Sequence, residues 1–439
     1  MRFIAVFRSW FPALAVVSYL IGTTLPESRG TKIAALMIVA RLLISNYAWL
    51  RKTSGRIAVA ILIVSLFVGG SHGLLAIVYG GIERYVGVVI LVLSISFLRL
   101  PLDQIRFDIG LFSKQGTRRG TGLPAITTAS SAISPLLNLG TIALFGGLLE
   151  THGAQAEKVS SAVTRGVGAA LLVSPTFAPT AIVLREFPDV TWASTLPIGL
   201  PLFVATLVLA WSRRDTIVVS WVQNKKRGYP PFHLALIVVF MGLILVGCRV
   251  FAQWSIVTSV SIAAIGSVYL WTYVVARSAI PRLTVNPRKH IGNIWPAIEA
   301  EAALFVVAGI LSSAISTNSV LSASAQSVVG EVTSPVVLYV IVLAGMPLIT
   351  ILGIHPIVPF VILVHLIDGA ALGLTPPEMY VFWVVGWIQS MMVSPVSALN
   401  ISASAFFHVS PWTIGIRENV PYAFAFGAIS LALFWTIGG

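Results

Sequence analysis

The stretch Leu172-Val173-Ser174-Pro175-Thr176 lies in the middle of a long apolar segment, and Met392-Val393-Ser394-Pro395-Val396 repeats its pattern in the second half of the chain. A proline removes a backbone donor and clashes with the preceding helical turn. In hydrocarbon, the carbonyl groups freed by such a break need new partners, so broken helices occur where they line a cavity enclosed by protein. Two Ser-Pro breaks at matching positions therefore predict a solute site between two halves of a transporter.

The composition indicates a polytopic membrane protein. The chain is 57% hydrophobic and only 10% charged, with a mean hydropathy of +0.93. Its apolar runs have the length of about 20 residues that spans a hydrocarbon core. Arg2 and Arg8 precede the first run and no small-residue cleavage site follows it, which favours a retained helix over a signal peptide. The lone Cys248 excludes an internal disulfide, and we expect it to be a packing residue.

Hydropathy predicts an all-α fold with about eleven transmembrane helices and two further apolar segments, each interrupted near its middle. The interruptions are Ser134-Pro135 in segment 121–150 and Gly353-Ile354-His355-Pro356 in segment 334–368. The expected spans are 9–24, 31–50, 57–80, 84–102, 157–184, 192–212, 232–252, 254–277, 296–316, 378–405 and 417–437.

Charge distribution decides whether the two interrupted segments are single spans or re-entrant hairpins. If both are hairpins and the N-terminus is cytoplasmic, most of the 28 Lys and Arg residues lie on the cytoplasmic side, as positive-inside topology requires. Counting only one segment as a full span would place a basic cluster, 213–227 or 277–289, outside. We therefore predict two hairpins and an external C-terminus, in a cell inner (plasma) membrane. The net charge of +13 then reflects basic residues in cytoplasmic loops, and nucleic acid is not an expected partner.

The two halves align beyond the Ser-Pro breaks. Ser134-Pro135 matches His355-Pro356 at an offset of 221, and Trp192 matches Trp412 at an offset of 220. An odd number of crossings separates the copies, which predicts two inverted repeats. The expected parts are a first helix (1–30), a scaffold part of each repeat (31–120 and 232–295), a transport part of each repeat (121–215 and 296–439) and a basic cytoplasmic linker (216–231).

Polar residues gather at the predicted hairpin tips and helix breaks. Half-helix N-termini favour anions, and unwound carbonyl groups can coordinate a cation such as sodium. The candidate solute-binding residues are Ser131, Ser134, Asn138, Ser174, Thr176, His355, Ser394, Ser397 and Asn400. The candidate coupling-ion residues are Ser134, Thr180, Gly353 and Ser402, with Na⁺ or H⁺ as the ion. No Asp or Glu lies within the membrane-embedded part of either broken helix, which favours an organic anion or a small polar solute over ion exchange through a carboxylate.

Each of these residues also has a structural interpretation. Ser and Thr in membrane helices commonly bond to their own backbone, and His355 could line the pocket or cap the hairpin turn. Asn400 could contact solute or cap the second half-helix. We expect Arg165 to snorkel to the cytoplasmic face, and Glu299 and Glu301 to stabilise the start of a helix.

This order of elements resembles the ion transporter superfamily, which includes the divalent anion/sodium symporters. In those symporters, a Ser-Asn-Thr signature at each hairpin tip binds the substrate carboxylate and sodium. The matching positions here read Ser134-Pro135-Leu136 and His355-Pro356-Ile357, so the signatures are absent. The resemblance implies an elevator mechanism, a homodimer formed through the scaffold, and interfacial arms near 103–120 and 282–295.

The leading hypothesis is a secondary active transporter, and its expected partners are membrane lipids and a small-molecule solute. A sodium or proton antiporter with His355 as the titrating group is the alternative. A non-transporting membrane component of lipid or envelope metabolism is the third. The chain has no phosphate-binding loop and no H-E-x-x-H motif, so we expect neither an enzyme nor a metal site.

Overall fold

The computed structural model describes residues 2–25, 29–45, 47–69, 73–102, 121–212, 218–221, 232–275, 286–330, 335–367 and 373–438. The chain divides into two compact units. Unit 1 comprises Met1–Ile105 and Gly228–Ser322, and unit 2 comprises Arg106–Arg227 and Ala323–Gly439. The predicted arm at 103–120 lies outside the described residues, as do residues 276–285 and most of the predicted linker.

Apolar helices dominate both units, which identifies an integral membrane protein. In the described part of the chain, seven helices are long and apolar enough to cross a membrane. They are Leu74–Pro101, Trp192–Ser212, Phe232–Val250, Ile256–Val274, Lys289–Thr317, Pro376–Phe407 and Thr413–Ile437. Shorter apolar helices are Trp10–Thr24, Thr53–Gly69, Leu123–Leu137, Pro335–Ile351 and Ile357–Leu366.

Unit 1 is a helical bundle in which small residues permit close packing. Its helices are α1 (Arg2–Thr24), α2 (Gly30–Leu43), η1 (Ala48–Arg51), α3 (Thr53–Gly69), α4 (Leu74–Arg84), α5 (Val86–Ile95), η2 (Ser96–Leu98), α6 (Arg99–Leu102), α12 (Phe232–Val250), α13 (Ile256–Val275) and α14 (Pro287–Thr317). A side chain at Gly81 or Gly309 would collide with the backbone of the other helix, so α4 and α14 pack backbone to backbone. The span expected at 57–80 differs, because α3 ends at Gly69 and α4 begins at Leu74.

Helix α14 changes two expectations. It begins at Pro287 and belongs to unit 1, whereas the sequence placed residues from 296 onward in the transport part. Glu299 and Glu301 therefore lie a dozen residues inside a helix rather than at its start. Lys52 donates to the carbonyl groups of Pro296 and Ala297 one turn earlier. Arg41 is buried, and the central carbon of its guanidinium lies 5.1 Å from the centre of the Trp295 ring.

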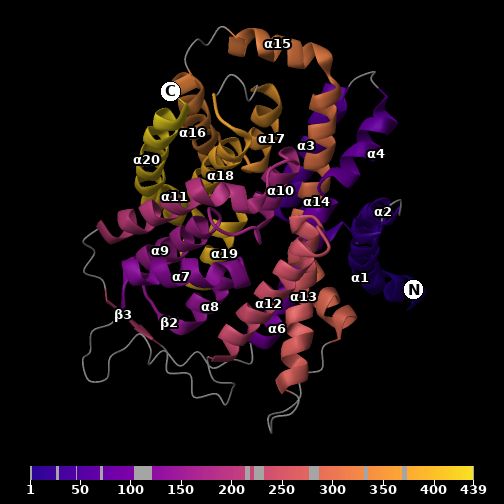
Figure 1. The fold of residues 1–439 in the computed structure, drawn as a ribbon, viewed down its shortest axis with the longest axis horizontal. Helices are drawn as coiled ribbons and strands as arrows, with labels where there is room; N and C mark the ends of the chain where they lie inside the picture. Colours follow the sequence, from indigo (N-terminus) through magenta and orange to yellow (C-terminus); the bar gives the residue numbers. More distant parts are fainter. Residues whose placement is uncertain are drawn as a thin grey trace. The chain divides into compact units, whose positions relative to one another are not determined.

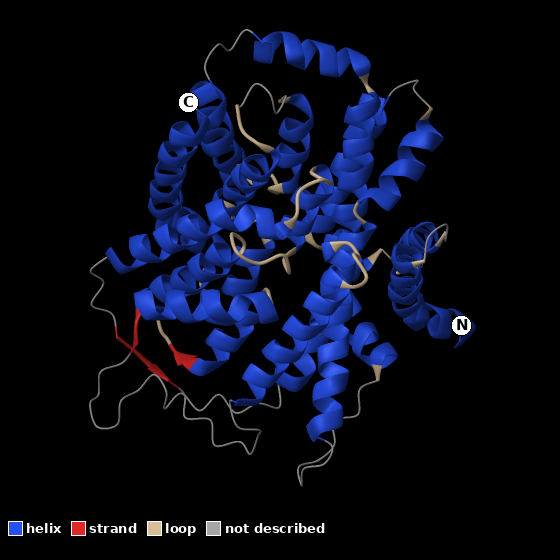
Figure 2. Cartoon of the chain, viewed as in Figure 1, coloured by secondary structure: helices blue, strands red, loops and turns tan. Residues whose placement is uncertain are grey.

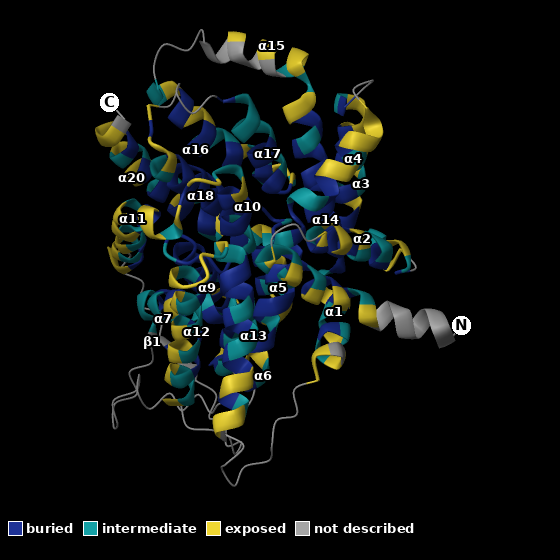
Figure 3. Ribbon diagram, turned by 45° about the vertical axis from the view of Figure 1, so that its right-hand side comes forward, coloured by how far each residue is buried: buried dark blue, intermediate teal, exposed yellow. Residues whose placement is uncertain are grey.

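Unit 2 contains the same series of elements twice (Figure 1). The first copy is α7 (Leu123–Leu137), α8 (Gly140–Leu148), α9 (Ala154–Ala170), α10 (Ala178–Glu186) and α11 (Trp192–Ser212). The second is α16 (Pro335–Ile351), α17 (Ile357–Leu366), α18 (Pro376–Val393), α19 (Ala398–Phe407) and the π-helix η5 (Thr413–Asn419) followed by α20 (Val420–Gly438). Helix α15 (Ser319–Gly330) precedes the second copy. In Figure 3, α9 and α18 are buried along most of their length.

A short three-stranded sheet, which the all-α expectation did not include, joins the ends of the first hairpin (Figure 2). Strand β3 (Val218–Trp221) lies between β1 (Thr121–Gly122) and β2 (Leu149–Glu150), and both pairings are antiparallel. Since β1 precedes α7 and β2 follows α8, the α7–α8 hairpin begins and ends at the same edge of unit 2. Strand β3 lies within the segment expected to be a linker.

Candidate functional site

The first helix break separates α9 from α10 and contains Ser174-Pro175. The side chains of Ser174 and Thr176 are buried, and their hydroxyl oxygens lie 2.9 Å apart. The Thr180 hydroxyl donates to the carbonyl of Phe177 at 2.8 Å, within the first turn of α10. Pro175 cannot donate a backbone hydrogen bond, which weakens the helix at this point, although Pro135, Pro197 and Pro201 lie inside continuous helices. The structure thus places the interruption where the sequence predicted it.

The second break separates α18 from α19, and side chains satisfy its exposed carbonyl groups. Ser397 caps α19 by accepting from the backbone nitrogen of Asn400 at 3.2 Å. The Ser397 hydroxyl donates to Met391 O at 2.7 Å. The Asn400 amide donates to Met392 O at 2.8 Å and to Ser394 O at 2.9 Å. Asn400 therefore caps the break, one of the two roles that the sequence allowed.

Three buried polar atoms near the second break have no hydrogen-bond partner in the described part of the protein. They are Ser390 Oγ, Ser394 Oγ and Asn400 Oδ1. A buried polar group without a partner costs about 1–3 kcal/mol. Groups of this kind in a native protein require an explanation, such as water, an ion or a ligand that completes them. The second break thus offers two hydroxyls and an amide oxygen to a polar ligand.

The tip of the first hairpin contacts the first break through Asn138. Asn138 has a left-handed φ of 53° directly after α7, and its side-chain amide donates to Thr176 O at 3.3 Å. The sequence placed Ser134-Pro135 at this tip, and that placement is wrong. Ser134 lies inside α7, where its hydroxyl donates to Ser130 O at 2.6 Å. Ser131 likewise bonds back, to Thr128 O at 2.8 Å.

The tip of the second hairpin lies between α16 and α17. Gly353, with a φ of 90°, makes the turn, and a residue with a side chain would be strained there. The Nδ1 atom of His355 accepts from the backbone nitrogen of Ile357 at 3.2 Å, so this imidazole caps the start of α17. That geometry matches the structural interpretation of His355. Ser402 lies on α19 and is partly exposed.

A threonine attaches each hairpin to its own broken helix. Thr127 of α7 donates to Ala162 O of α9 at 3.0 Å. Thr350 of α16 donates to Ser390 O of α18 at 3.1 Å. Because each hairpin arm is bonded to the half-helix before its break, hairpin and broken helix form one packed element in both copies.

Glycines of the last helix in each copy lie against the breaks, a feature that the sequence interpretation missed. A side chain at Gly199 of α11 would collide with Leu172 O, and one at Gly415 of η5 would collide with Val393 O. These carbonyl groups come just before the two Ser-Pro pairs. A glycine in the last helix of each repeat was the available signal, but many other glycines in this chain carry no such contact.

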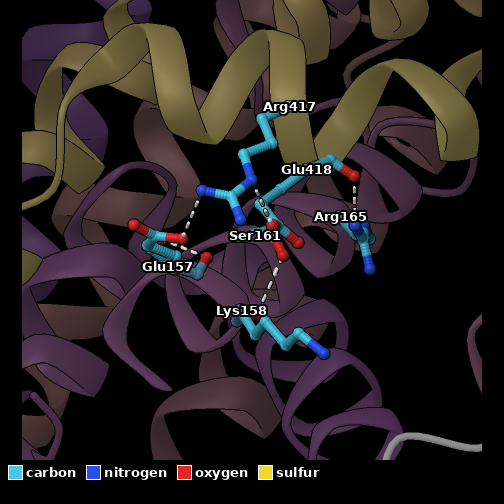
Figure 4. A network of polar contacts seen from close by, with 7 residues as sticks. Glu157, Lys158, Ser161, Arg165, Arg417 and Glu418 are labelled. Carbon is cyan, nitrogen blue, oxygen red and sulfur yellow. Dashed lines mark hydrogen bonds and ion pairs between the residues drawn. The ribbon is translucent and has the colours of Figure 1, made fainter. Parts of the chain in front are cut away.

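Two further residues, Arg165 and Asn419, join the copies, and the sequence interpretation misjudged the first and missed the second. Figure 4 shows Arg165 beside Glu418. Arg165 was expected to snorkel, but it is only 4% exposed. Its Nε donates to Asn419 Oδ1 at 3.0 Å and a terminal nitrogen donates to Glu418 O at 2.6 Å. Its guanidinium also lies 4.8 Å from the Tyr422 ring. Asn419 is fully buried.

The two broken helices run in opposite directions within unit 2. The start of α9 and the end of α19 line one polar cavity of about 320 Å³, which includes His152, Glu157 and His408. At the other end of α10, Glu186 lies 3.6 Å from His365, at the end of the hairpin that precedes α18. The beginning of one broken helix therefore adjoins the end of the other.

Six of the nine candidate solute-binding residues form two groups, each held together by hydrogen bonds within it, and His355 belongs to neither group. Asn138, Thr176 and Ser174 form the first, and Ser394, Ser397 and Asn400 form the second. Ser131 and Ser134 bond within α7, apart from both groups. The described residues contain no cluster of three or more His, Cys, Asp or Glu side chains suited to a metal ion.

No protein-family model matches this chain, and no curated protein matches it. Among solved structures, the chain is similar to the crystal structure of the Alcanivorax borkumensis YdaH transporter, reported as revealing an unusual topology. The sequence identity is 14% and the TM-score is 0.47, over 99% of this chain and 97% of that one. A likeness at this level identifies neither a solute nor a coupling ion.

Proposed function

We propose that this protein is a secondary active transporter of an organic anion or another small polar solute. The observation that carries the proposal is the pair of interrupted helices, α9/α10 and α18/α19, which run in opposite directions through one unit. Interrupted helices in inverted repeats are how many secondary transporters bind solute near the middle of the membrane. Buried hydroxyls and amides at both interruptions supply the contacts.

The chemistry of the breaks favours a solute that is anionic or neutral. In α9, α10, α18 and α19, the carboxylates lie only in terminal turns, at Glu157, Glu186 and Glu378. The unpartnered Ser390 and Ser394 hydroxyls can donate to a solute oxygen. The N-terminus of α10 adds partial positive charge beside the Ser174–Thr176 pair. We place the solute between the hairpin tips and the two breaks.

The proposal includes two re-entrant hairpins and about eleven spans in all. The sheet β1–β3–β2 supports re-entry of the first hairpin, since both ends of that hairpin pair with one strand. Unit 2 would be the mobile transport domain and unit 1 the scaffold of a homodimeric elevator. Na⁺ or H⁺ would drive transport, with Thr180 and Gly353 as candidate contacts for the ion.

Ligand screening followed by uptake assays tests the proposal. Purified protein is screened by thermal shift against organic acids, in sodium chloride and in choline chloride, and stabilising compounds are then assayed for uptake into proteoliposomes. We expect Ser394→Ala and Ser174→Ala to lower uptake at wild-type protein levels. Ser430→Ala is the matched control, because Ser430 is equally buried but bonds back to Phe426 O within α20. Wild-type uptake in both site variants would refute the site.

A further inference from the structure

We infer that Arg165 and Asn419 are a positioning pair through which the first repeat fixes the shape of the second repeat's helix break. Arg165 belongs to α9, and Asn419 is the last residue of the π-helix η5. The role of that break in solute binding rests on the proposed function. The structural coupling itself can be tested without a solute.

The Asn419 amide bridges α9 and the second break. Its Oδ1 accepts from Arg165 Nε at 3.0 Å. Its Nδ2 donates to Thr164 Oγ1 at 3.0 Å and lies 3.4 Å from Met392 O. Arginine has donors and no acceptor, so it determines which end of the amide faces it. The NH₂ group is thereby directed toward the carbonyl of Met392.

Arg165 is suited to this role because its guanidinium engages two successive residues of η5. One nitrogen binds the Asn419 side chain and another binds the Glu418 carbonyl. The ring of Tyr422 lies against the same group at 4.8 Å. A lysine ammonium lacks the planar, fixed set of donors that makes these contacts simultaneous.

The π-helix lies directly against the break that it supports. A side chain at Gly415 would collide with Val393 O, and one at Gly168 of α9 would collide with the Met392 side chain. Met392 O also accepts from Asn400 at 2.8 Å, so amides of two different elements converge on this carbonyl. Single π-helical turns occur frequently at functional sites, where they redirect side chains.

The first break has no side-chain amide at the positions that correspond to Asn400 and Asn419. At the repeat offset of 220, the counterpart of Asn419 is Gly199 and the counterpart of Asn400 is Thr180. Neither counterpart carries an amide, and the Thr180 hydroxyl donates to Phe177 O instead. The two breaks are therefore not equivalent. The second break is held by side chains of both repeats, whereas among the described residues the first break receives a side-chain amide from its own repeat, that of Asn138.

Hydrogen exchange measured by mass spectrometry tests the inference on purified protein in detergent. We expect Arg165→Met and Asn419→Leu each to accelerate amide exchange in residues 391–400 by about tenfold. Each variant loses the hydrogen bond between Arg165 and Asn419, and with it the oriented contact of the Asn419 amide with Met392 O. The double variant should exchange no faster than the more affected single variant, and Arg165→Lys should recover part of the protection. Arg417→Met is the control, because it removes a 72% exposed arginine from the same π-helix.

Wild-type exchange in residues 391–400 of Arg165→Met would overturn the inference. An equal acceleration in Arg417→Met, or additive effects in the double variant, would also overturn it. If Arg165→Met does not purify as a monodisperse protein, the comparison of Arg165→Lys with wild type decides, since intermediate exchange is expected there. A failed solute screen would refute the proposed function and leave the exchange result intact. With a solute in hand, Arg165→Lys should raise KM more than it lowers the maximal rate.

Discussion

At the scale of single residues, polar side chains in this membrane protein divide by where their hydrogen bonds go. Ser131 and Ser134 donate to carbonyl groups of their own helix, which any serine in a continuous helix can do. Ser394 and Asn400 lie where the helix is interrupted and keep atoms that no described residue satisfies. Residue type and approximate position could be predicted from the sequence. The sequence could not predict which hydroxyl groups donate to carbonyl groups of their own helix, because that depends on where each helix ends.

Asn400→Ala should destabilise the protein strongly. The fully buried amide donates to the carbonyl groups of Met392 and Ser394. Its loss leaves Met392 O with the longer 3.4 Å contact from Asn419, and Ser394 O with the Ser397 hydroxyl. We expect a loss of about 2–3 kcal/mol, measured as a lower thermal midpoint in detergent. Asn286→Ala is the control, since Asn286 caps an exposed helix start through Lys289 N and should cost about 1 kcal/mol or less. A smaller effect at Asn400 than at Asn286 would contradict the capping role.

His355→Asn should leave proton flux unchanged in everted vesicles. In the structure His355 Nδ1 accepts from Ile357 N at 3.2 Å, and the asparagine oxygen can accept the same hydrogen bond without titrating. His355→Ala should lower the thermal midpoint because the cap is lost. Proton flux abolished in His355→Asn, with thermal stability retained, would instead support the antiporter alternative.

At the scale of elements, local signals predicted the two helix breaks, but they misplaced the tip of the first hairpin and did not predict the π-helix or the sheet. Proline disfavours its own helical turn, and the repeated Ser-Pro pattern marked the break between α9 and α10. Pro135, by contrast, lies inside α7. Pro421 lies two residues after the π-helix η5, but the aligned Pro201 lies inside the α-helix α11, so proline alone did not predict η5. The neighbour of η5 in the structure is the break in another helix. Strands β1 and β2 are two residues long, and they exist only because β3 lies between them.

The sheet predicts a specific cross-link. Glu150 and Ser220 are Cα partners in the β2–β3 pairing, and directly opposed positions on antiparallel strands are close enough for a disulfide. In a Cys248→Ala background, Glu150→Cys with Ser220→Cys should cross-link under mild oxidation, detected as a mobility shift on gels. Glu150→Cys with Val219→Cys is the control, because neighbouring strand positions face opposite sides. Equal cross-linking in both pairs would contradict the register.

At the scale of the whole molecule, hydropathy predicted most helices and motif spacing predicted the repeat, but the boundary between the units lies elsewhere than expected. A helix that is apolar on every side gives no sequence signal of which neighbours it will contact. Helix α14 joins unit 1 because Gly309 and Gly81 allow it to approach α4 closely, a fit that only the folded structure reveals. The duplication was easier to predict, since it depends on spacing along the chain alone.

Opposite orientation of the repeats makes a prediction about sidedness. His152 precedes α9 and His408 follows α19, so both should face one side of the membrane. Asp189 follows α10 and Thr375 precedes α18, so both should face the other side. In a Cys248→Ala background, an impermeant maleimide applied to intact cells should label cysteines at 189 and 375. Cysteines at 152 and 408 should react only after permeabilisation, because basic residues place that side in the cytoplasm. Labelling of positions 152 and 375 from the same side would mean that the repeats run in parallel, and binding between two opposed breaks would then have no structural basis.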